Sequence, residues 1–262
     1  MERFITYEFQ VFAPVRIGEV AGYAFLDTGA SSSRICQSYA NDLPRIGAAQ
    51  LRGALGTTQV EQCTLERVSL LGHDFLDVVA RIQPDEAGGF QDLPFPVVMT
   101  VGADILFQKV LYLECAAGRV GFLQSVPPEL EKRAQAVDLL FQRKYAFFSI
   151  NLGDHQLNAA FDVGAGYCVL NARCLEALQA DLMEQQPEET MDSTGAKAEI
   201  PVYKHPALQV GRLCLGGIRF LVMDLTPVEQ ALDVVVDFIF GFNAMMNQNW
   251  IVDKANQRLL LL

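Results

Sequence analysis

The chain has 262 residues, enough for two small domains, and its hydrophobic content of 51% favours folded cores over disorder. A net charge of −11, spread over both halves, argues against a nucleic-acid partner and excludes a polybasic membrane surface. Six cysteines lack C-x-x-C spacing and three histidines stand apart from them, so we expect reduced, buried thiols and no metal. No phosphate-binding loop indicates a cofactor. The sequence shows no leader or membrane-length apolar run, so we expect a cytoplasmic protein that does not contact a membrane.

The first half of the chain is expected to be mostly β-structure. Residues 4–12 are rich in aromatic and β-branched side chains, which predicts a strand. In chain order there follow a hairpin over 14–26, a short helix or loop over 34–43, a Gly-tipped hairpin over 51–65, two strands over 68–82 and a surface loop over 84–96.

Residues 126–144 are expected to link the two halves. Apolar residues at helical spacing over 128–143, with acids at the start and bases at the end, predict a helix in this linker. A packed surface helix without a functional role is the alternative. Beyond the linker we expect a helix over 171–183 with Asn171 as its N-cap, a solvated acidic loop over 184–189, and a hairpin over 208–225 around Gly216-Gly217.

One motif stands out at residues 24–31. An apolar run ends in Asp27, and Thr28, Gly29 and Ala30 follow it directly. Glycine permits a tight turn, so the pattern predicts a buried strand that leads into a loop carrying one carboxylate. A single copy of this pattern is more typical of an ordinary surface turn.

The same motif occurs a second time around Asp162. An apolar strand again ends in an aspartate, and Val163, Gly164 and Ala165 follow it. Residues 15–19 align with residues 150–154 at the same offset that separates Asp27 from Asp162. Residues 97–106 and 236–245 also correspond, with Gly102 matching Gly241 at a slightly larger offset. An internal duplication at this period predicts two similar lobes, residues 1–125 and 145–262.

These paired motifs resemble the aspartic peptidases of the pepsin and retropepsin group. The resemblance implies an all-β, mostly antiparallel fold with two β-barrel-like lobes related by pseudo-two-fold symmetry and a few short helices. It also implies that residues 4–12 and 259–262 lie in a sheet that joins the lobes. Retropepsins are homodimers, whereas this chain looks like two such lobes fused head to tail, so we expect a monomer that acts as a fused pseudo-dimer.

The resemblance implies an aspartic endopeptidase that hydrolyses peptide bonds of an extended polypeptide. Asp27 and Asp162 would activate water between the lobes. Thr28, Gly29, Ala30, Val163, Gly164 and Ala165 would shape the two loops, with Gly102 and Gly241 beneath them. The hairpin with Gly53, Leu55, Gly56 and Thr57 stands where the family has its substrate-covering flap, and Gly195 marks a second flap candidate. An ordinary hairpin turn is the alternative at the first place.

Two departures from the family pattern stand beside these matches. Val163 occupies the place of a threonine, so only Thr28 can send a hydroxyl across to the other loop. Retroviral members also pair an acid after the first motif with an arginine after the later glycine, and here those places hold Ser31, Ser32 and Ala103. A catalytically weak or inactive peptide-binding or scaffold module on the same fold is therefore the alternative function.

Overall fold

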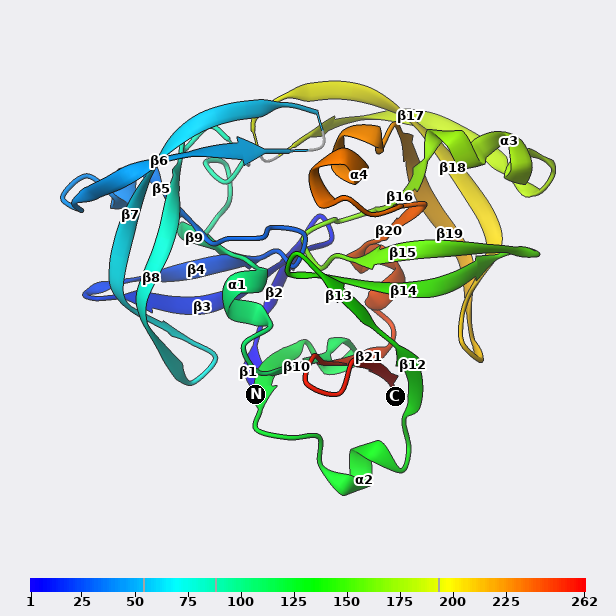
Figure 1. Ribbon diagram of the computed structural model, residues 1–262, viewed down its shortest axis with the longest axis horizontal. Helices are drawn as coiled ribbons and strands as arrows, with labels where there is room; N and C mark the ends of the chain where they lie inside the picture. Colours follow the sequence, from blue (N-terminus) through cyan, green and yellow to red (C-terminus); the bar gives the residue numbers. More distant parts are fainter. Residues whose placement is uncertain (54, 88, 193) are drawn as a thin grey trace.

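The computed structural model describes residues 1–53, 55–87, 89–192 and 194–262. Figure 1 shows two lobes side by side, the earlier residues on the left and the later ones on the right, above a third sheet that carries both chain ends. The chain is mostly β-structure with a few short helices, as the sequence predicts.

The left lobe is one eight-stranded sheet that curls until β3 also pairs with β7. Its order is β2-β3-β4-β9-β5-β8-β7-β6. The strands are β2 (Ile5–Tyr7), β3 (Gln10–Ile17), β4 (Val20–Leu26), β5 (Arg34–Cys36), β6 (Arg45–Arg52), β7 (Thr57–Leu70), β8 (His73–Gln83) and β9 (Val97–Val101).

The right lobe repeats this arrangement strand for strand. Its order is β13-β14-β15-β20-β16-β19-β18-β17, again closed by an extra pairing, β14 with β18. The strands are β13 (Leu140–Gln142), β14 (Tyr145–Leu152), β15 (His155–Phe161), β16 (Cys168–Asn171), β17 (Met183–Met191), β18 (Lys197–Val210), β19 (Leu213–Met223) and β20 (Phe238–Phe240). The identical order confirms the two similar lobes predicted from the repeated motifs.

The third sheet joins the lobes. Its order is β1 (Glu2–Arg3), β11 (Arg119–Leu123), β10 (Val110–Glu114), β21 (Asn249–Asp253), β22 (Arg258–Leu261) and β12 (Gln135–Asp138). The antiparallel pairing of β10 with β21 is the seam between the halves. The C-terminal strand β22 lies in this sheet as expected, but residues 4–12 do not, because the N-terminal strand here is β1. Residues 4–12 instead form β2 and the start of β3 in the left lobe, with Glu8 and Phe9 at positive φ between the two strands.

The helices are short, and the linker helix is much shorter than predicted. They are α1 (Ala103–Leu106), α2 (Pro128–Glu131), α3 (Leu175–Leu178), α4 (Thr226–Leu232) and α5 (Phe242–Met245), with 3-10 turns η1 (Gln37–Tyr39), η2 (Cys115–Ala117), η3 (Ala172–Cys174) and η4 (Gln179–Asp181). After one turn at α2 the linker becomes β12 and β13. Pairing of β12 with the C-terminal β22 overrides the helical spacing of its apolar residues.

Three other local predictions are corrected by strand pairing. Residues 34–36 form β5 rather than a helix or loop, and the acidic residues 184–189 belong to β17, which pairs with β18. The turn of the 208–225 hairpin lies at Gly211, which has φ +57°, and not at Gly216-Gly217.

The predicted helix over 171–183 is a series of short turns, and Asn171 does cap the first of them.

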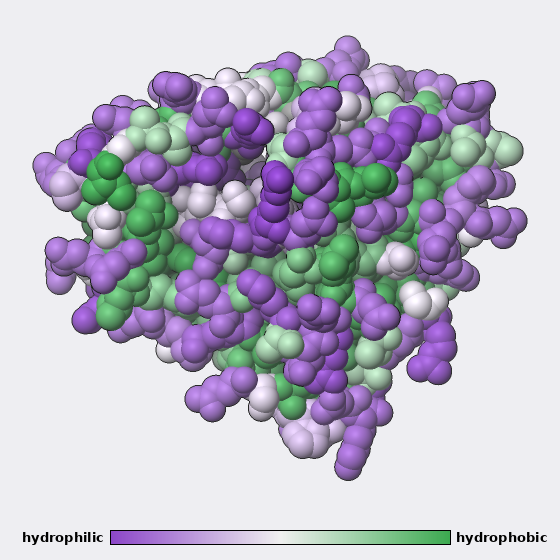
Figure 2. Space-filling view, viewed as in Figure 1, coloured by the Kyte–Doolittle hydropathy of each residue, from purple (hydrophilic) through white to green (hydrophobic). Residues whose placement is uncertain are grey.

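The core runs through both lobes and the seam between them. Phe161, Phe240 and Trp250 are nearly or fully buried and in contact, so the strand that leads to Asp162 packs directly on the interlobe sheet. The face seen in Figure 2 is largely hydrophilic, with an apolar patch at the left over β7 and β8. Leu76 and Val79 of β8 are among the exposed apolar side chains.

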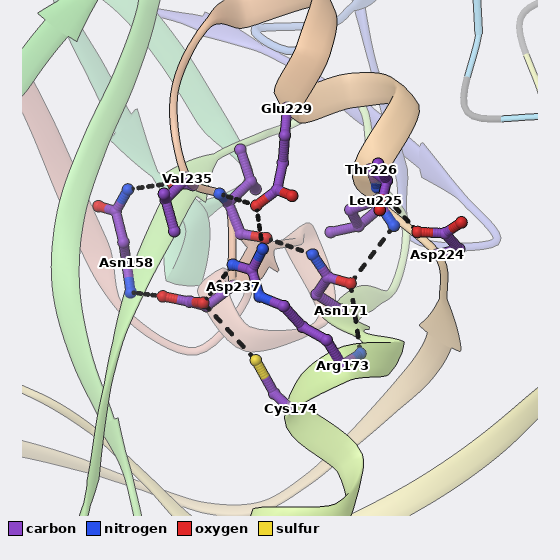
Figure 3. A network of polar contacts seen from close by, with 11 residues as sticks. Asn158, Asn171, Arg173, Cys174, Asp224, Leu225, Thr226, Glu229, Val235 and Asp237 are labelled. Atoms are coloured by element: carbon purple, nitrogen blue, oxygen red, sulfur yellow. Dashed lines mark hydrogen bonds and ion pairs between the residues drawn. The ribbon is translucent and has the colours of Figure 1, made fainter.

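A polar network holds the helical turns of the right lobe against its sheet (Figure 3). The Arg173 guanidinium binds Glu229 on α4 and Asp237, each at 2.6 Å. Asp237 also accepts the backbone N–H of Asn158 at 2.9 Å. The network therefore fixes the residue that directly precedes β20, the strand beside which Asp162 is placed.

The cysteines form no disulfide among the described residues. Cys36, Cys63, Cys115 and Cys168 are buried, as the sequence predicts, whereas Cys174 is partly exposed and Cys214 is exposed. Within the described parts of the chain, none of the helices has both the length and the apolar character needed to span a membrane.

Candidate active site

Asp27 and Asp162 occupy equivalent places at the ends of two buried strands. Asp27 follows β4, and its backbone N–H donates to the Val101 carbonyl of β9 at 3.0 Å. Asp162 follows β15, and its N–H donates to the Phe240 carbonyl of β20 at 3.0 Å. The last three residues of each strand are apolar and largely buried. Each sheet therefore delivers one carboxylate to the lobe interface.

The two aspartate loops face each other across that interface. The Gly29 amide donates to Asp162 Oδ1 at 2.9 Å, and the Gly164 amide donates to the same oxygen at 2.9 Å. A Cβ on Gly29 would overlap the Asp162 carboxylate, and a Cβ on Gly164 would overlap that of Asp27. Glycine is thus required at both places because the opposite carboxylate lies there. Such reciprocal contacts are typical of a two-fold relation.

Thr28 joins the two loops beneath the carboxylates. Its fully buried hydroxyl donates to the Phe161 carbonyl at 3.0 Å and accepts the Val163 amide at 2.9 Å. Val163 is also buried and has no hydroxyl to return the contact. At this pair of positions only the side chain of Thr28 therefore bonds across the lobes, as the valine in the second motif leads us to expect.

Gly102 and Gly241 lie below the loops, where the sequence places them. The backbone N–H after Gly102 donates to the Ala30 carbonyl at 2.8 Å, and the N–H after Gly241 donates to the Ala165 carbonyl at 2.7 Å. A side chain on either glycine would overlap the backbone of the loop above it. This pair of contacts holds Ala30 and Ala165 in matching positions.

Arg34 is a site residue that the sequence reading missed. It begins β5, is 3% exposed, and its Nη2 contacts Asp27 Oδ2 at 2.5 Å. Its counterpart in the other lobe, at the offset that separates Asp27 from Asp162, is Val169. When the two repeats are aligned position by position, this arginine corresponds to an apolar residue. That difference is the sequence signal that marks it.

The environment gives the two carboxyl groups different proton affinities. Burial leaves the pKa of Asp27 raised, although the charge of Arg34 and the amides of Gly29 and Ala30 oppose the shift. Burial, and then the negative charge of Asp27, raise the pKa of Asp162 to about 7, although the amides of Gly164 and Gly29 oppose the shift. A close pair of carboxyl groups shares one proton over a wide pH range, and here Arg34 favours the charge on Asp27.

This shift predicts a pH dependence of stability that Asp162 controls. Between about pH 4 and 7 an unfolded chain loses the Asp162 proton whereas the folded chain retains it, so the free energy of unfolding falls as pH rises through this window. Asp162→Asn cannot ionise, and its amide oxygen can still accept from Gly29. We therefore expect the melting temperature of Asp162→Asn, relative to the parent, to rise from pH 4 to pH 7.

Thermal unfolding at one-unit pH steps measures this difference. Asp154→Asn, at an exposed turn of the same lobe, is the matched control and should follow the parent at every pH. A difference between Asp162→Asn and the parent that stays constant with pH would contradict the raised pKa.

A cleft of about 1720 Å³ lies above the two aspartates. Both carboxylates line it, together with Gly29, Ala30, Gly164 and Ala165. Its opposite wall is the tip of the β6–β7 hairpin, where Gly53, Leu55, Gly56 and Thr57 also line the cleft. Ala54, within the predicted flap, lies outside the described residues. Gly195 does not line the cleft, and a Cβ on this residue would contact Ala87.

The tips of the two long hairpins are joined through Asp192. This residue follows β17, and its Oδ2 accepts the amides of Leu55 at 2.7 Å and Gly56 at 3.1 Å from the other lobe. Its Oδ1 accepts the Thr194 amide at 2.8 Å within its own hairpin. The cleft is therefore covered by both hairpins and closed by one carboxylate. No sequence signal marks Asp192, because acidic residues are common at hairpin tips.

Removing this carboxylate should open the covering hairpins. Asp192→Ala leaves the Leu55 and Gly56 amides without their acceptor, so we expect their hydrogen exchange to accelerate by roughly tenfold or more, the equivalent of one charge-assisted hydrogen bond. Thr194→Val is the matched control, because it removes a contact to Oδ1 and leaves both cross-lobe contacts to Oδ2. Equal exchange in Asp192→Ala and the parent would show that Asp192 does not hold the tips together.

Comparison with known proteins finds one protein family that is similar to part of this chain. Residues 148–244 match the model of the aspartyl protease family. The matched segment runs from β14 to α5 and includes the Asp162 loop and Gly241. No curated protein matches the chain. Similarity to an aspartyl protease family is thus found in the right lobe, and the left lobe repeats the strand order of that lobe.

Proposed function

We propose that this chain is an aspartic endopeptidase that uses Asp27 and Asp162 to activate water between its lobes. The observation that carries the proposal is the facing pair of aspartate loops, in which the Gly29 amide binds the carboxylate of Asp162. The match to an aspartyl protease family over residues 148–244 supports the same reaction class. The reading as a pepsin- or retropepsin-like enzyme rests on the doubled motif.

The pairing of Arg34 with Asp27 alone supports a different role for each carboxyl group. Arg34 favours the ionised form of Asp27, which takes a proton from the attacking water. Asp162, whose pKa lies near 7, carries the shared proton and donates it to the oxygen of the scissile carbonyl. Water adds directly to the carbonyl carbon, so no acyl-enzyme forms. The proton that Asp27 took from the water then passes to the leaving amine as the C–N bond breaks. The N–H of Gly29 keeps Asp162 oriented without removing its proton.

The proposed substrate is a polypeptide in an extended conformation, bound below the two hairpins. A cleft of about 1720 Å³ has room for several residues. Because one chain supplies both aspartate loops, we propose that the active form is a monomer that corresponds to a fused dimer. The reaction requires no cofactor.

Cleavage of an unfolded protein tests the proposal. The parent chain should release fragments from a reduced and carboxymethylated protein at mildly acidic pH. A peptide in which a hydroxyl-bearing carbon replaces the scissile carbonyl should compete, because it resembles the tetrahedral intermediate. Mass spectrometry identifies the fragments. An intact substrate at every pH from 4 to 7 would contradict the proposal.

A peptide-binding module without turnover is the second candidate, and Arg34 is the observation that favours it. An arginine at 2.5 Å from Asp27 Oδ2 occupies an oxygen that would otherwise be free to bind water. Val163 also departs from the doubled threonine of the family. Tight binding of a labelled peptide by the parent, without any fragment, would support this function over catalysis.

A further inference from the structure

The two lobes present chemically different walls to the cleft. In the left lobe β5 pairs with β8, which sets Arg34 opposite Arg81 and Cys36 opposite Gln83. In the right lobe β16 pairs with β19 in the same way, which sets Val169 opposite Leu221 and Asn171 opposite Met223. The two pairs of strands occupy equivalent places in the two sheets. Arg34, Arg81 and Gln83 are therefore the counterparts of Val169, Leu221 and Met223.

All six of these side chains line the same cleft. The left wall, Arg34 with Arg81 and Gln83, offers two guanidinium groups and an amide. The right wall, Val169 with Leu221 and Met223, offers only apolar groups at the matching places. The pseudo-symmetry of the backbone is kept while the chemistry of the walls differs. A polypeptide lying across the cleft meets one wall on each side of the two aspartates.

The left wall has more positive charge than the protein neutralises. Arg34 is paired with Asp27, but Arg81 has no ion pair among the residues that the structure describes. The Nε atoms of both arginines and the Oε1 of the 2%-exposed Gln83 are buried without a partner. Burial, and then the charge of Arg34, lower the pKa of Arg81, although Tyr145 and Asp104 oppose the shift. An unpaired cation in this setting is costly, and a bound anion removes that cost.

Three acids on the facing lobe have partners of their own. Glu188 binds Arg219 and Glu189 binds Lys197, while Asp192 binds the hairpin amides. These three acids are therefore engaged elsewhere and do not form ion pairs with Arg81. Within the described residues the Arg81 guanidinium thus binds no carboxylate, on a cleft wall of a protein whose net charge is −11.

Building on the proposed function, we propose that the substrate carries an acidic side chain on one side of the cleaved bond, bound by Arg81, and an apolar side chain on the other. The planar guanidinium suits a carboxylate, which it can bind through two parallel hydrogen bonds. Arg34 stays with Asp27 and does not leave it for the substrate. Val169, Leu221 and Met223 receive the apolar side chain by excluding water from it.

Binding of non-cleavable peptides tests this inference independently of turnover. Two peptides with a reduced scissile amide differ only by glutamate or glutamine at the position facing the left wall. Because either side of the bond could face that wall, the pair is prepared in both orientations. We expect the parent to bind the glutamate peptide about 10–100-fold more tightly, as one charge-assisted contact provides. The preference should decline as salt is added.

Arg81→Leu copies the residue of the right lobe and should bring the ratio of the two dissociation constants close to one. Arg81→Lys keeps the charge and should retain part of the preference. Leu221→Val is the matched control on the apolar wall and should leave the glutamate preference in place. Thermal unfolding verifies that each variant is folded.

The outcomes separate this inference from the proposed function. Equal binding of the glutamate and glutamine peptides by the parent would overturn the acidic subsite, even if the chain cleaves proteins. A glutamate preference that survives in Arg81→Leu would overturn the assignment to Arg81. A glutamate preference in a chain that leaves the unfolded protein substrate intact would contradict the proposed peptidase activity and leave the acidic subsite supported.

Discussion

Asp27→Asn and Asp162→Asn should each reduce cleavage of a polypeptide by roughly 10²–10⁴-fold, the usual contribution of a positioned acid or base. Asparagine keeps the size of the side chain but can neither accept the proton of water nor supply one to the carbonyl. The Gly29 amide can still bind the oxygen of residue 162, so the loop geometry is retained. The initial rate of fragment release, at matched protein concentrations, gives the effect.

The two aspartates act on one water molecule, so their losses should not add. The double variant Asp27→Asn/Asp162→Asn is expected to be no slower than the slower single variant, because either change already removes the paired mechanism. Asp154→Asn, on an exposed turn, controls for the loss of one carboxylate and should keep the full rate. Full activity in either site variant would remove that aspartate from the mechanism.

Thr28→Val should be the most destabilising conservative change in the two loops. The fully buried hydroxyl satisfies one backbone carbonyl and one backbone amide of the opposite lobe. Valine fits the volume but leaves both groups unpaired, at a cost of about 2–4 kcal/mol. For a chain of this size we expect the melting temperature to fall by roughly 5–15 °C. Thr28→Ser, which keeps the hydroxyl, should lose much less.

Val163→Thr tests the other half of the same contact. Internal symmetry makes the Leu26 carbonyl the counterpart of the Phe161 carbonyl, because each residue directly precedes its aspartate. A threonine hydroxyl at position 163 would have that acceptor, so we expect a neutral to mildly stabilising effect. Melting temperatures of the single and double variants separate the two contacts. A Thr28→Val protein as stable as the parent would contradict the role of the hydroxyl.

The duplicated motifs carry most of what could be predicted. A common offset around Asp27 and Asp162 predicts two lobes of one kind, and the two sheets do have the same strand order. The glycines that follow each aspartate, and Gly102 and Gly241 beneath them, are predictable because close backbone approach excludes a side chain. At these positions the glycine expected from the motif is also the residue that close packing requires.

The predictions that fail depend on contacts between distant segments. Residues 135–138 carry helical spacing, yet they form β12 because β22, at the far end of the chain, supplies a strand partner. Arg34 reads as part of a polar stretch, and only the pairing of β5 with β8 and β9 brings it inward to Asp27. Asp192 meets Leu55 and Gly56 from the opposite half of the chain. Propensity within a short window contains no information about these partners.

The pairing of β10 with β21 within a single polypeptide has a genetic consequence. In an assembly of two identical subunits every substitution occurs twice, so an arginine at one aspartate would bring a second arginine to the other. Here each half has its own stretch of coding sequence. The first half can therefore have Arg34 where the second half has Val169. Covalent linkage also keeps the halves together at any dilution. Selection can therefore act on one aspartate at a time, which a symmetric dimer does not allow.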